Sequence, residues 1–187
     1  KRVNQAQGQD LILTSANNLY EGITQQEVEA YYNKLKDPKD QTPISYGLNT
    51  KLVKIDGKVV ELPYKAGGLY GEAIEKIVYW LEKALTVTEN EAQHAALEKM
   101  IEFYRSGDLK DFDEYAKLWV KDTESLIDYV CCYTESYGDP LGMKASWEAL
   151  VNYKDLAATA RAEKMSENAQ WFEDHAPIAD EFKKEEC

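Results

Sequence analysis

The stretch Leu52-Val53-Lys54-Ile55-Asp56-Gly57-Lys58-Val59-Val60-Glu61-Leu62 decides the fold class, because it places two β-prone runs inside an otherwise helical sequence. Two such runs joined by Asp-Gly are the strongest local signal for a β-hairpin. The stretch therefore predicts an antiparallel hairpin near residues 50–62.

Helical patterns lie on both sides of this hairpin. Thr24 and Glu27 have the spacing of a capping box, and the helix that follows ends before Pro38. Residues 1–22 carry Gly and Asn interruptions and predict irregular structure. Apolar residues at helical spacing predict further helices over 74–85, from Thr88 to Ser106, from about 111 to 120, and from 155 through 172. The second of these is expected to open with a capping box at Thr88.

A second β component is expected in the last third of the chain. The run Leu126–Tyr133 is rich in β-branched and aromatic residues, which favours a strand near 126–136. Asp139-Pro140-Leu141-Gly142 has the residue preferences of a type I turn, so a returning strand is expected near 145–153. The predicted fold class is α+β, mostly helical with a small antiparallel β component.

Size and charge exclude several classes of protein. A chain of 187 residues with a formal net charge of −12 and no basic stripe is unsuited to nucleic acid. No apolar run reaches the ~18–20 residues of a membrane span. Three cysteines without metal or disulfide spacing favour a reducing, cytoplasmic location. The chain starts at Lys1 without Met, so we expect the true N-terminus to be absent.

No catalytic or metal site can be built from the residues alone. The only histidines, His94 and His175, do not begin a His-Glu-x-x-His motif. Cys131 and Cys132 could serve as nucleophiles only with a His base, and cysteines in an apolar strand are more often small core residues. The Gly67–Gly71 loop lacks phosphate-binding spacing and is interpreted as a helix entry.

One segment resembles a known family. Glu135-Ser136-Tyr137-Gly138-Asp139-Pro140-Leu141-Gly142, followed by Lys144-Ala145-Ser146-Trp147-Glu148, resembles a conserved block of the dipeptidyl peptidase III family. Blocks similar to those of its bacterial members follow the same order from about Val3 to Lys184. The family is a two-lobed zinc exopeptidase that removes dipeptides from the N-terminus of oligopeptides. Its zinc is held by a His-Glu-x-x-Gly-His helix and a later Glu-Glu-x-Arg-Ala-Asp/Glu motif. Neither motif is in this chain. The resemblance therefore implies no catalytic residue and no metal ligand here, with zinc held elsewhere in the parent.

The resemblance also implies a place for the chain and one binding element. Residues 1–187 are expected to form a single fragment of the lobe with the β core. In the family, a strand lining the cleft contacts the substrate's N-terminal part with an acidic residue and a Tyr two positions later. These positions align with Asp128, which keeps the acid, and Val130, which departs from the pattern. Asp128 could equally be a polar residue on the open face of the strand.

Two functions follow from the sequence. The first is a fragment of a zinc-dependent dipeptidyl peptidase that is inactive alone, forms one wall of the peptide cleft and needs the remaining lobe of its parent. The alternative is a non-catalytic helical α+β module that binds a peptide or a protein partner.

Overall fold

The predicted hairpin is present as β2 (Thr50–Ile55) and β3 (Lys58–Pro63) in the computed structural model, which describes all residues 1–187. Asp56 and Gly57 have φ angles of 49° and 77°, the positive values that a type I′ turn requires at both central positions. The antiparallel register extends from Ile55 opposite Lys58 to Thr50 opposite Pro63. The local turn chemistry thus produces the predicted element.

A third strand joins this sheet from a region that we expected to be irregular. β1 (Tyr20–Glu21) pairs in parallel with β2, with Tyr20 opposite Leu52. A strand of only two residues carries no periodic pattern, and its partner strand β2 lies about 30 positions further along the chain. The sequence therefore could not predict this pairing. The expectation of an antiparallel β component holds for the other strands.

Helix α1 (Gln25–Leu35) starts at the predicted capping box. The Thr24 hydroxyl accepts from the Glu27 backbone N–H, and the Glu27 carboxylate accepts from the Thr24 N–H at 3.0 Å. Val28 and Tyr32 are the buried residues of this helix.

We expect Thr24→Ala to lower the free energy of unfolding by about 1 kcal/mol, because the helix would lose its side-chain cap. Urea unfolding of the wild type, Thr24→Ala and Thr24→Ser at pH 7 provides the measurement. The serine variant keeps the hydroxyl and should lose little. Equal midpoints for the alanine and serine variants would contradict the role of the cap.

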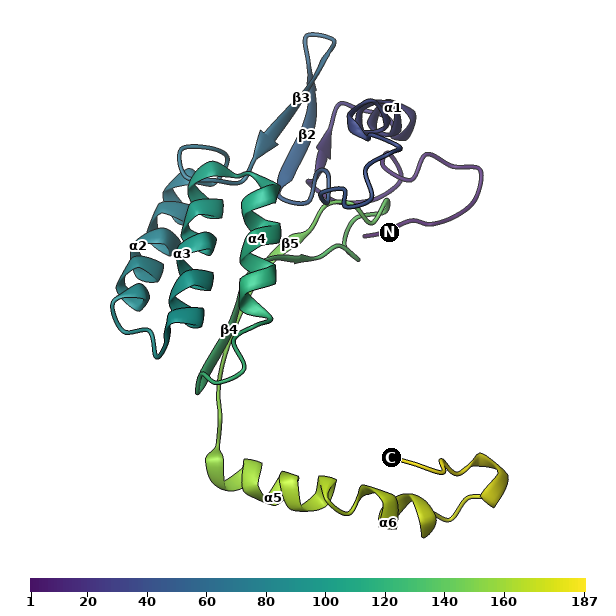
Figure 1. The fold of residues 1–187 in the computed structure, drawn as a ribbon. Helices are drawn as coiled ribbons and strands as arrows, with labels where there is room; N and C mark the ends of the chain where they lie inside the picture. Colours follow the sequence, from purple (N-terminus) through teal and green to yellow (C-terminus); the bar gives the residue numbers. More distant parts are fainter. The chain divides into compact units, whose positions relative to one another are not determined.

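Three helices, α2 (Gly71–Leu85), α3 (Glu91–Ser106) and α4 (Leu109–Trp119), lie side by side with α3 in contact with both others (Figure 1). Two predicted starts were wrong. The N-cap of α3 is Asn90 and not Thr88, since Asn90 accepts from the Gln93 N–H. Asp108 caps α4, so that helix begins at Leu109, earlier than the expected start near Asp111.

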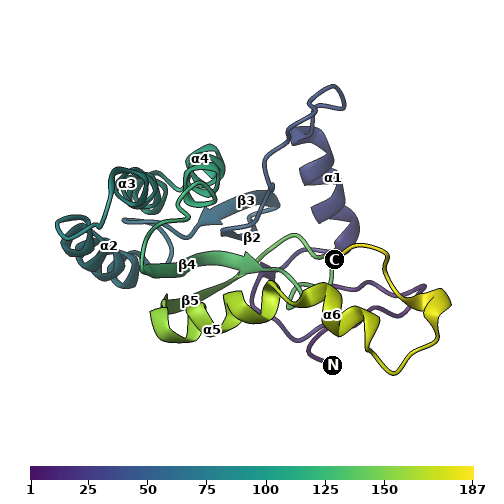
Figure 2. The same ribbon diagram turned by 60° about the horizontal axis from the view of Figure 1, so that its bottom comes forward.

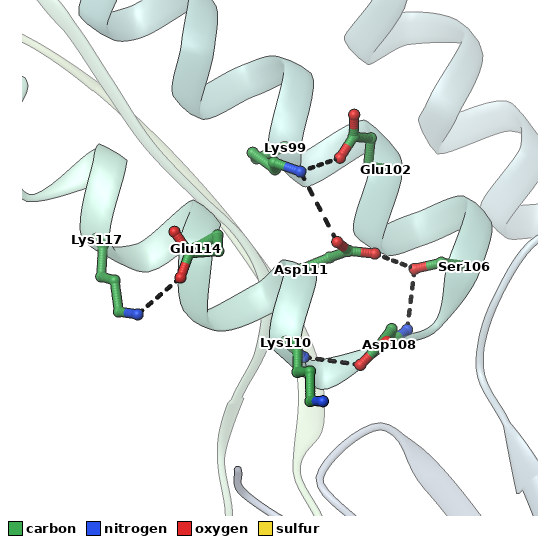
Figure 3. A network of polar contacts seen from close by, with 8 residues as sticks. All are labelled: Lys99, Glu102, Ser106, Asp108, Lys110, Asp111, Glu114 and Lys117. Atoms are coloured by element: carbon green, nitrogen blue, oxygen red, sulfur yellow. Dashed lines mark hydrogen bonds and ion pairs between the residues drawn. The ribbon is translucent and has the colours of Figure 1, made fainter. Parts of the chain in front are cut away.

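Polar contacts connect the exposed sides of α3 and α4 (Figure 3). The Asp111 carboxylate accepts from the Ser106 hydroxyl at 2.6 Å and lies 3.9 Å from the Lys99 ammonium. Ser106 in turn accepts from the Asp108 N–H at 3.0 Å. These contacts hold the tight connection between the two helices.

The main hydrophobic core lies between these helices and the strand β4 (Ile127–Glu135). Met100, Phe103 and Tyr104 of α3 are fully buried in it, and Cys132 of β4 is nearly so. A smaller cluster, which includes Val28, Tyr32 and Leu52, joins α1 to the three-stranded sheet.

β4 and β5 (Ser146–Tyr153) form a two-stranded sheet, which confirms the strands expected near 126–136 and 145–153. Between them, the Gly142 N–H donates to the Asp139 carbonyl at 3.0 Å, the i to i+3 bond of the expected turn. Gly142 has a φ of 64°, a conformation that favours glycine.

The C-terminal residues contain α5 (Leu156–Ser166), α6 (Ala169–Asp174) and a 3₁₀ turn, Asp180–Phe182. The single helix predicted through Phe172 was wrong, because the helix breaks at 167–168. There the Asn168 side chain donates to the Lys164 carbonyl at 2.8 Å and satisfies an end of α5. No helix of the chain combines the length and the apolar character that a membrane span needs.

The chain divides into two compact units. The first comprises residues 1–125 and 129–150, and the second comprises residues 126–128 and 151–187. Both hydrophobic clusters lie in the first unit.

Candidate functional site

The turn that joins β4 to β5 is built around the buried carboxylate of Asp139. This side chain is 2% exposed and accepts the Tyr20 hydroxyl at 2.8 Å. It also accepts three backbone N–H groups of its own turn, from Leu141, Met143 and Lys144, at 2.8–3.0 Å. Four donors thus satisfy one carboxylate, and the turn is fixed to strand β1 through Tyr20.

Lys144 is fully buried behind the same turn. Its ammonium donates to the Tyr32 hydroxyl and the Thr50 hydroxyl, each at 2.7 Å, and to the Gly47 carbonyl at 3.2 Å. The two hydroxyls then donate to one oxygen of Glu61 at 2.6 and 2.7 Å. Two hydroxyls therefore bridge a buried cation to a carboxylate on β3.

Gly47 permits this close packing. Its φ is 85°, and a Cβ atom there would lie 2.6 Å from the Tyr32 hydroxyl oxygen. A side chain at this position would displace the group that accepts from Lys144.

Burial is the main cause of the shifted pKa values in this network. Desolvation lowers the pKa of Lys144 to about 8, although the charges of Glu61 and Asp139 act in the opposite direction. Desolvation also raises the pKa values of Tyr20 and Tyr32, so both phenols stay protonated and can donate. Sequence reasoning gave no role to Lys144, since lysine is rarely fully buried.

Tyr104 of α3 fixes the two strands to the main core. Its hydroxyl donates to the Cys131 carbonyl at 2.6 Å and accepts the Trp147 indole N–H at 2.8 Å. One phenol thus contacts both β4 and β5.

The cysteines of β4 are core residues in this arrangement. Burial raises the pKa of the Cys132 thiol to about 12, and it also raises that of Cys131. A nucleophilic cysteine needs a lowered pKa. The structure therefore favours a packing role for Cys131 and Cys132 over a nucleophilic role.

Two of the open cavities in the first unit adjoin each other. One, of about 690 Å³, is lined by residues 36–48 on one side and by Thr134, Ser136, Gly142 and Met143 of the β4–β5 region on the other. A neighbouring cavity of about 580 Å³ is bounded by α4 and shares four lining residues with the first, Asp40, Pro43, Ile44 and Tyr46. The β4–β5 turn therefore borders a space large enough for a few peptide residues.

Both predicted site residues lie on β4. Asp128 is exposed and belongs to the second compact unit, while Val130 is half-buried and belongs to the first. Asp128 engages in a polar or electrostatic interaction within the protein. The contact of either residue with a peptide stays a prediction.

The residues present do not fit a zinc site. His94 is exposed on α3, where its Nδ1 lies 3.2 Å from the Thr88 hydroxyl. His175 follows α6 and stacks on Trp171, with ring centroids 4.3 Å apart. No group of three His, Cys, Asp or Glu side chains is placed to hold a metal ion.

Comparison with known proteins identifies the family. The sequence profile of peptidase family M49 matches residues 24–187. Dipeptidyl peptidase 3 of Dictyostelium discoideum is 29% identical over 132 residues, which are 71% of this chain and 19% of that protein. Dipeptidyl peptidase 3 of Homo sapiens is 26% identical over 118 residues, which are 63% of this chain and 16% of that protein.

Solved structures show the same relationship. Dipeptidyl-peptidase III from Corallococcus sp. strain EGB aligns with a TM-score of 0.59 and 26% identity, over 89% of this chain and 30% of that one. DPP III from Caldithrix abyssi shares the fold with a TM-score of 0.64 at 22% identity, over 99% of this chain and 35% of that one. The chain spans less than one fifth of the length of the dipeptidyl peptidase 3 proteins of Dictyostelium discoideum and Homo sapiens. The resemblance seen in the sequence is thereby confirmed, and the chain belongs to peptidase family M49.

Proposed function

We propose that this chain is part of a zinc-dependent dipeptidyl peptidase that removes N-terminal dipeptides from oligopeptides in the cytoplasm. Residues 1–187 act as one fragment of it and contribute a wall of the peptide cleft along β4. Zinc, the remaining lobe and the catalytic residues lie outside these residues. The match to family M49 over residues 24–187 carries the proposal.

The geometry supports a binding role rather than a catalytic one for this part. Residues 129–135 of β4, which belong to the first unit, are held from two sides, by Tyr104 through the Cys131 carbonyl and by the turn around Asp139. Binding residues need rigid supports of this kind. Asp128 offers a carboxylate on that strand, which suits the ammonium group at the N-terminus of a peptide.

We expect the chain alone to release no dipeptide from a dipeptidyl arylamide, with or without added zinc, because its histidines cannot form a metal site. A chromogenic assay of the purified chain provides the measurement. The product of the complete gene should carry a His-Glu-x-x-Gly-His motif and cleave the same substrate. Turnover by the chain that survives repurification would refute its proposed inactivity.

We also expect Asp128→Asn to weaken binding of a tetrapeptide with a free N-terminus by about fivefold, the effect of about 1 kcal/mol in a charge pair. Titration calorimetry at millimolar peptide measures this. Glu124→Gln, which removes an exposed charge just before the strand, should leave the affinity unchanged. An N-acetylated peptide should bind the wild type and Asp128→Asn equally.

The alternative is a non-catalytic module that binds a peptide or protein partner. Such a module would bind its partner in the cavity of about 690 Å³ beside the β4–β5 turn. Its binding would then be independent of Asp128. Binding that survives both Asp128→Asn and N-acetylation would support this alternative. No detectable heat at millimolar peptide would count against a peptide site in either form.

A further inference from the structure

We propose that Lys144 is a pH-sensitive clamp, which holds one wall of the cavity of about 690 Å³ as an ammonium ion and releases that wall as a neutral amine. The wall is the turn of residues 44–48, which we call the cavity turn. All the residues involved belong to the first compact unit. The inference goes beyond the proposed function, because it holds whether or not the chain is part of a peptidase.

Two neighbouring hydrogen bonds join the walls of this cavity. In both views the connection from β4 to β5 runs from the end of β4 toward α1 (Figures 1 and 2). From this connection, the Lys144 ammonium donates to the Gly47 carbonyl at 3.2 Å. The next backbone N–H, that of Ala145, donates to the Leu48 carbonyl at 2.9 Å. The cavity turn is therefore held by one bond that depends on a titratable side chain and one that does not.

The Lys144 ammonium uses all three of its protons. Its acceptors are the hydroxyl oxygens of Tyr32 and Thr50, each at 2.7 Å, and the Gly47 carbonyl. Each hydroxyl gives its single proton to Glu61, at 2.6 and 2.7 Å. The Thr50 oxygen also lies 3.2 Å from the Gly47 carbonyl, but the carboxylate is closer and, as a charged acceptor, holds the proton more strongly. Neither hydroxyl thus has a proton for Gly47.

A neutral amine has only two N–H groups for the same three acceptors. Gly47 is the acceptor that loses its donor, because its bond to the nitrogen is the longest of the three. The two hydroxyls are in addition polarised by their own bonds to Glu61, which makes their oxygens the better acceptors. Deprotonation therefore breaks the bond that crosses between the walls.

The loss of this bond unlocks the cavity turn. Gly47 is buried, so its carbonyl would be left without a donor if the turn kept its place. Gly47 also lines a cavity of about 310 Å³, where water reaches a carbonyl that turns outward. Ile44 and Tyr46, which line both larger cavities, belong to the same turn and move with it. One buried proton thereby sets the shape of the cavity.

The groups that face Lys144 place this transition in mildly alkaline solution. Burial lowers the pKa of Lys144 to about 8, against the charges of Glu61 on β3 and Asp139 of its own turn. The rings of Tyr20 on β1 and Tyr32 on α1 lie 5.5 and 5.1 Å from its Nζ and also favour the ammonium. Burial raises the pKa values of both phenols, so they keep their protons while Lys144 loses its own.

Hydrogen exchange of the Ala145 amide tests the clamp, because that amide forms the second bond between the walls. NMR of residues 1–187 at pH 7 and 9 under reducing conditions gives the exchange rate, which is divided by the intrinsic rate at each pH. We expect the protection of Ala145 to fall about fivefold from pH 7 to 9, the effect of one ordinary hydrogen bond. The protection of Met100 in the main core should not fall, since deprotonation also removes the cost of a buried charge. The ¹³C shift of Lys144 Cε reports its protonation in the same samples.

A matched pair of variants tests the count of protons. Thr50→Val removes one acceptor and keeps the shape of the side chain. The two N–H groups of the neutral amine then serve Tyr32 and Gly47, so the protection of Ala145 should not change between pH 7 and 9. Thr42→Val removes an exposed hydroxyl outside this network and should keep the fivefold fall.

Three outcomes would overturn the clamp. The first is a Lys144 amine that forms near pH 8 with no change at Ala145, since a hydroxyl proton would then have turned to Gly47. The second is an equal fall in Thr50→Val, which would assign the effect to the charge and not to the number of N–H groups. The third is a Lys144 side chain that keeps its proton at pH 9. The wild-type titration decides the first and third without any variant, and none of these results depends on peptide cleavage.

Discussion

Asp139→Ala is expected to lower the free energy of unfolding by about 4 kcal/mol, since it removes the acceptor for four hydrogen bonds in a buried turn. The Tyr20 hydroxyl and the N–H groups of Met143 and Lys144 share one carboxylate oxygen, and they would lose it together. Each buried donor without a partner costs about 1–3 kcal/mol.

Urea unfolding at pH 7 measures the loss, and two variants separate its causes. Tyr20→Phe removes one donor together with its need for a partner, so it should cost about 1 kcal/mol. Asp37→Ala removes an exposed carboxylate that accepts a single N–H, from Lys39, and should cost less than about 1 kcal/mol. A loss for Asp139→Ala no larger than that for Asp37→Ala would mean that water reaches the turn.

The fold was predictable where a local signal decides it. Asp56-Gly57 between β-prone runs specified the β2–β3 hairpin, because only a turn with two positive φ angles fits there. Thr24 and Glu27 specified the start of α1 in the same way. The break between α5 and α6 was not predicted. The Asn168 side chain ends α5 by donating to the Lys164 carbonyl, but asparagine also occurs inside helices, so the sequence does not mark the break.

The supports of the candidate site were not predictable, because they join distant parts of the chain. Tyr20 and Asp139 lie 119 positions apart, and Lys144 and Tyr32 lie 112 apart. Residue preferences favour a surface position for an isolated lysine, so nothing local signals a fully buried one. Asp128 and Val130 were identified only through the family resemblance, and their contact with a peptide stays a prediction.

Lys144 should make the stability of the protein depend on pH in the alkaline range. Its folded pKa of about 8 lies below its ordinary value of 10.5, so the unfolded chain binds more protons between these values. The cost of burying the charge is therefore fully present below pH 8 and disappears as pH rises toward 10.5. The full difference corresponds to about 3 kcal/mol, of which about half falls between pH 8 and 9.5.

The comparison with Lys144→Met isolates this contribution. Buried phenols and thiols, such as those of Tyr32 and Cys132, have raised pKa values. Through these groups the folded state becomes less stable as pH rises, in the wild type and in Lys144→Met alike. Urea unfolding at pH 7, 8 and 9.5 under reducing conditions should therefore show the wild type gaining about half of this difference relative to Lys144→Met between pH 8 and 9.5. Lys83→Met, in which an exposed lysine is replaced, should track the wild type. A difference between the wild type and Lys144→Met that stays constant with pH would mean that the Lys144 ammonium reaches water, and that the hydroxyls of Tyr32 and Thr50 do not enclose it.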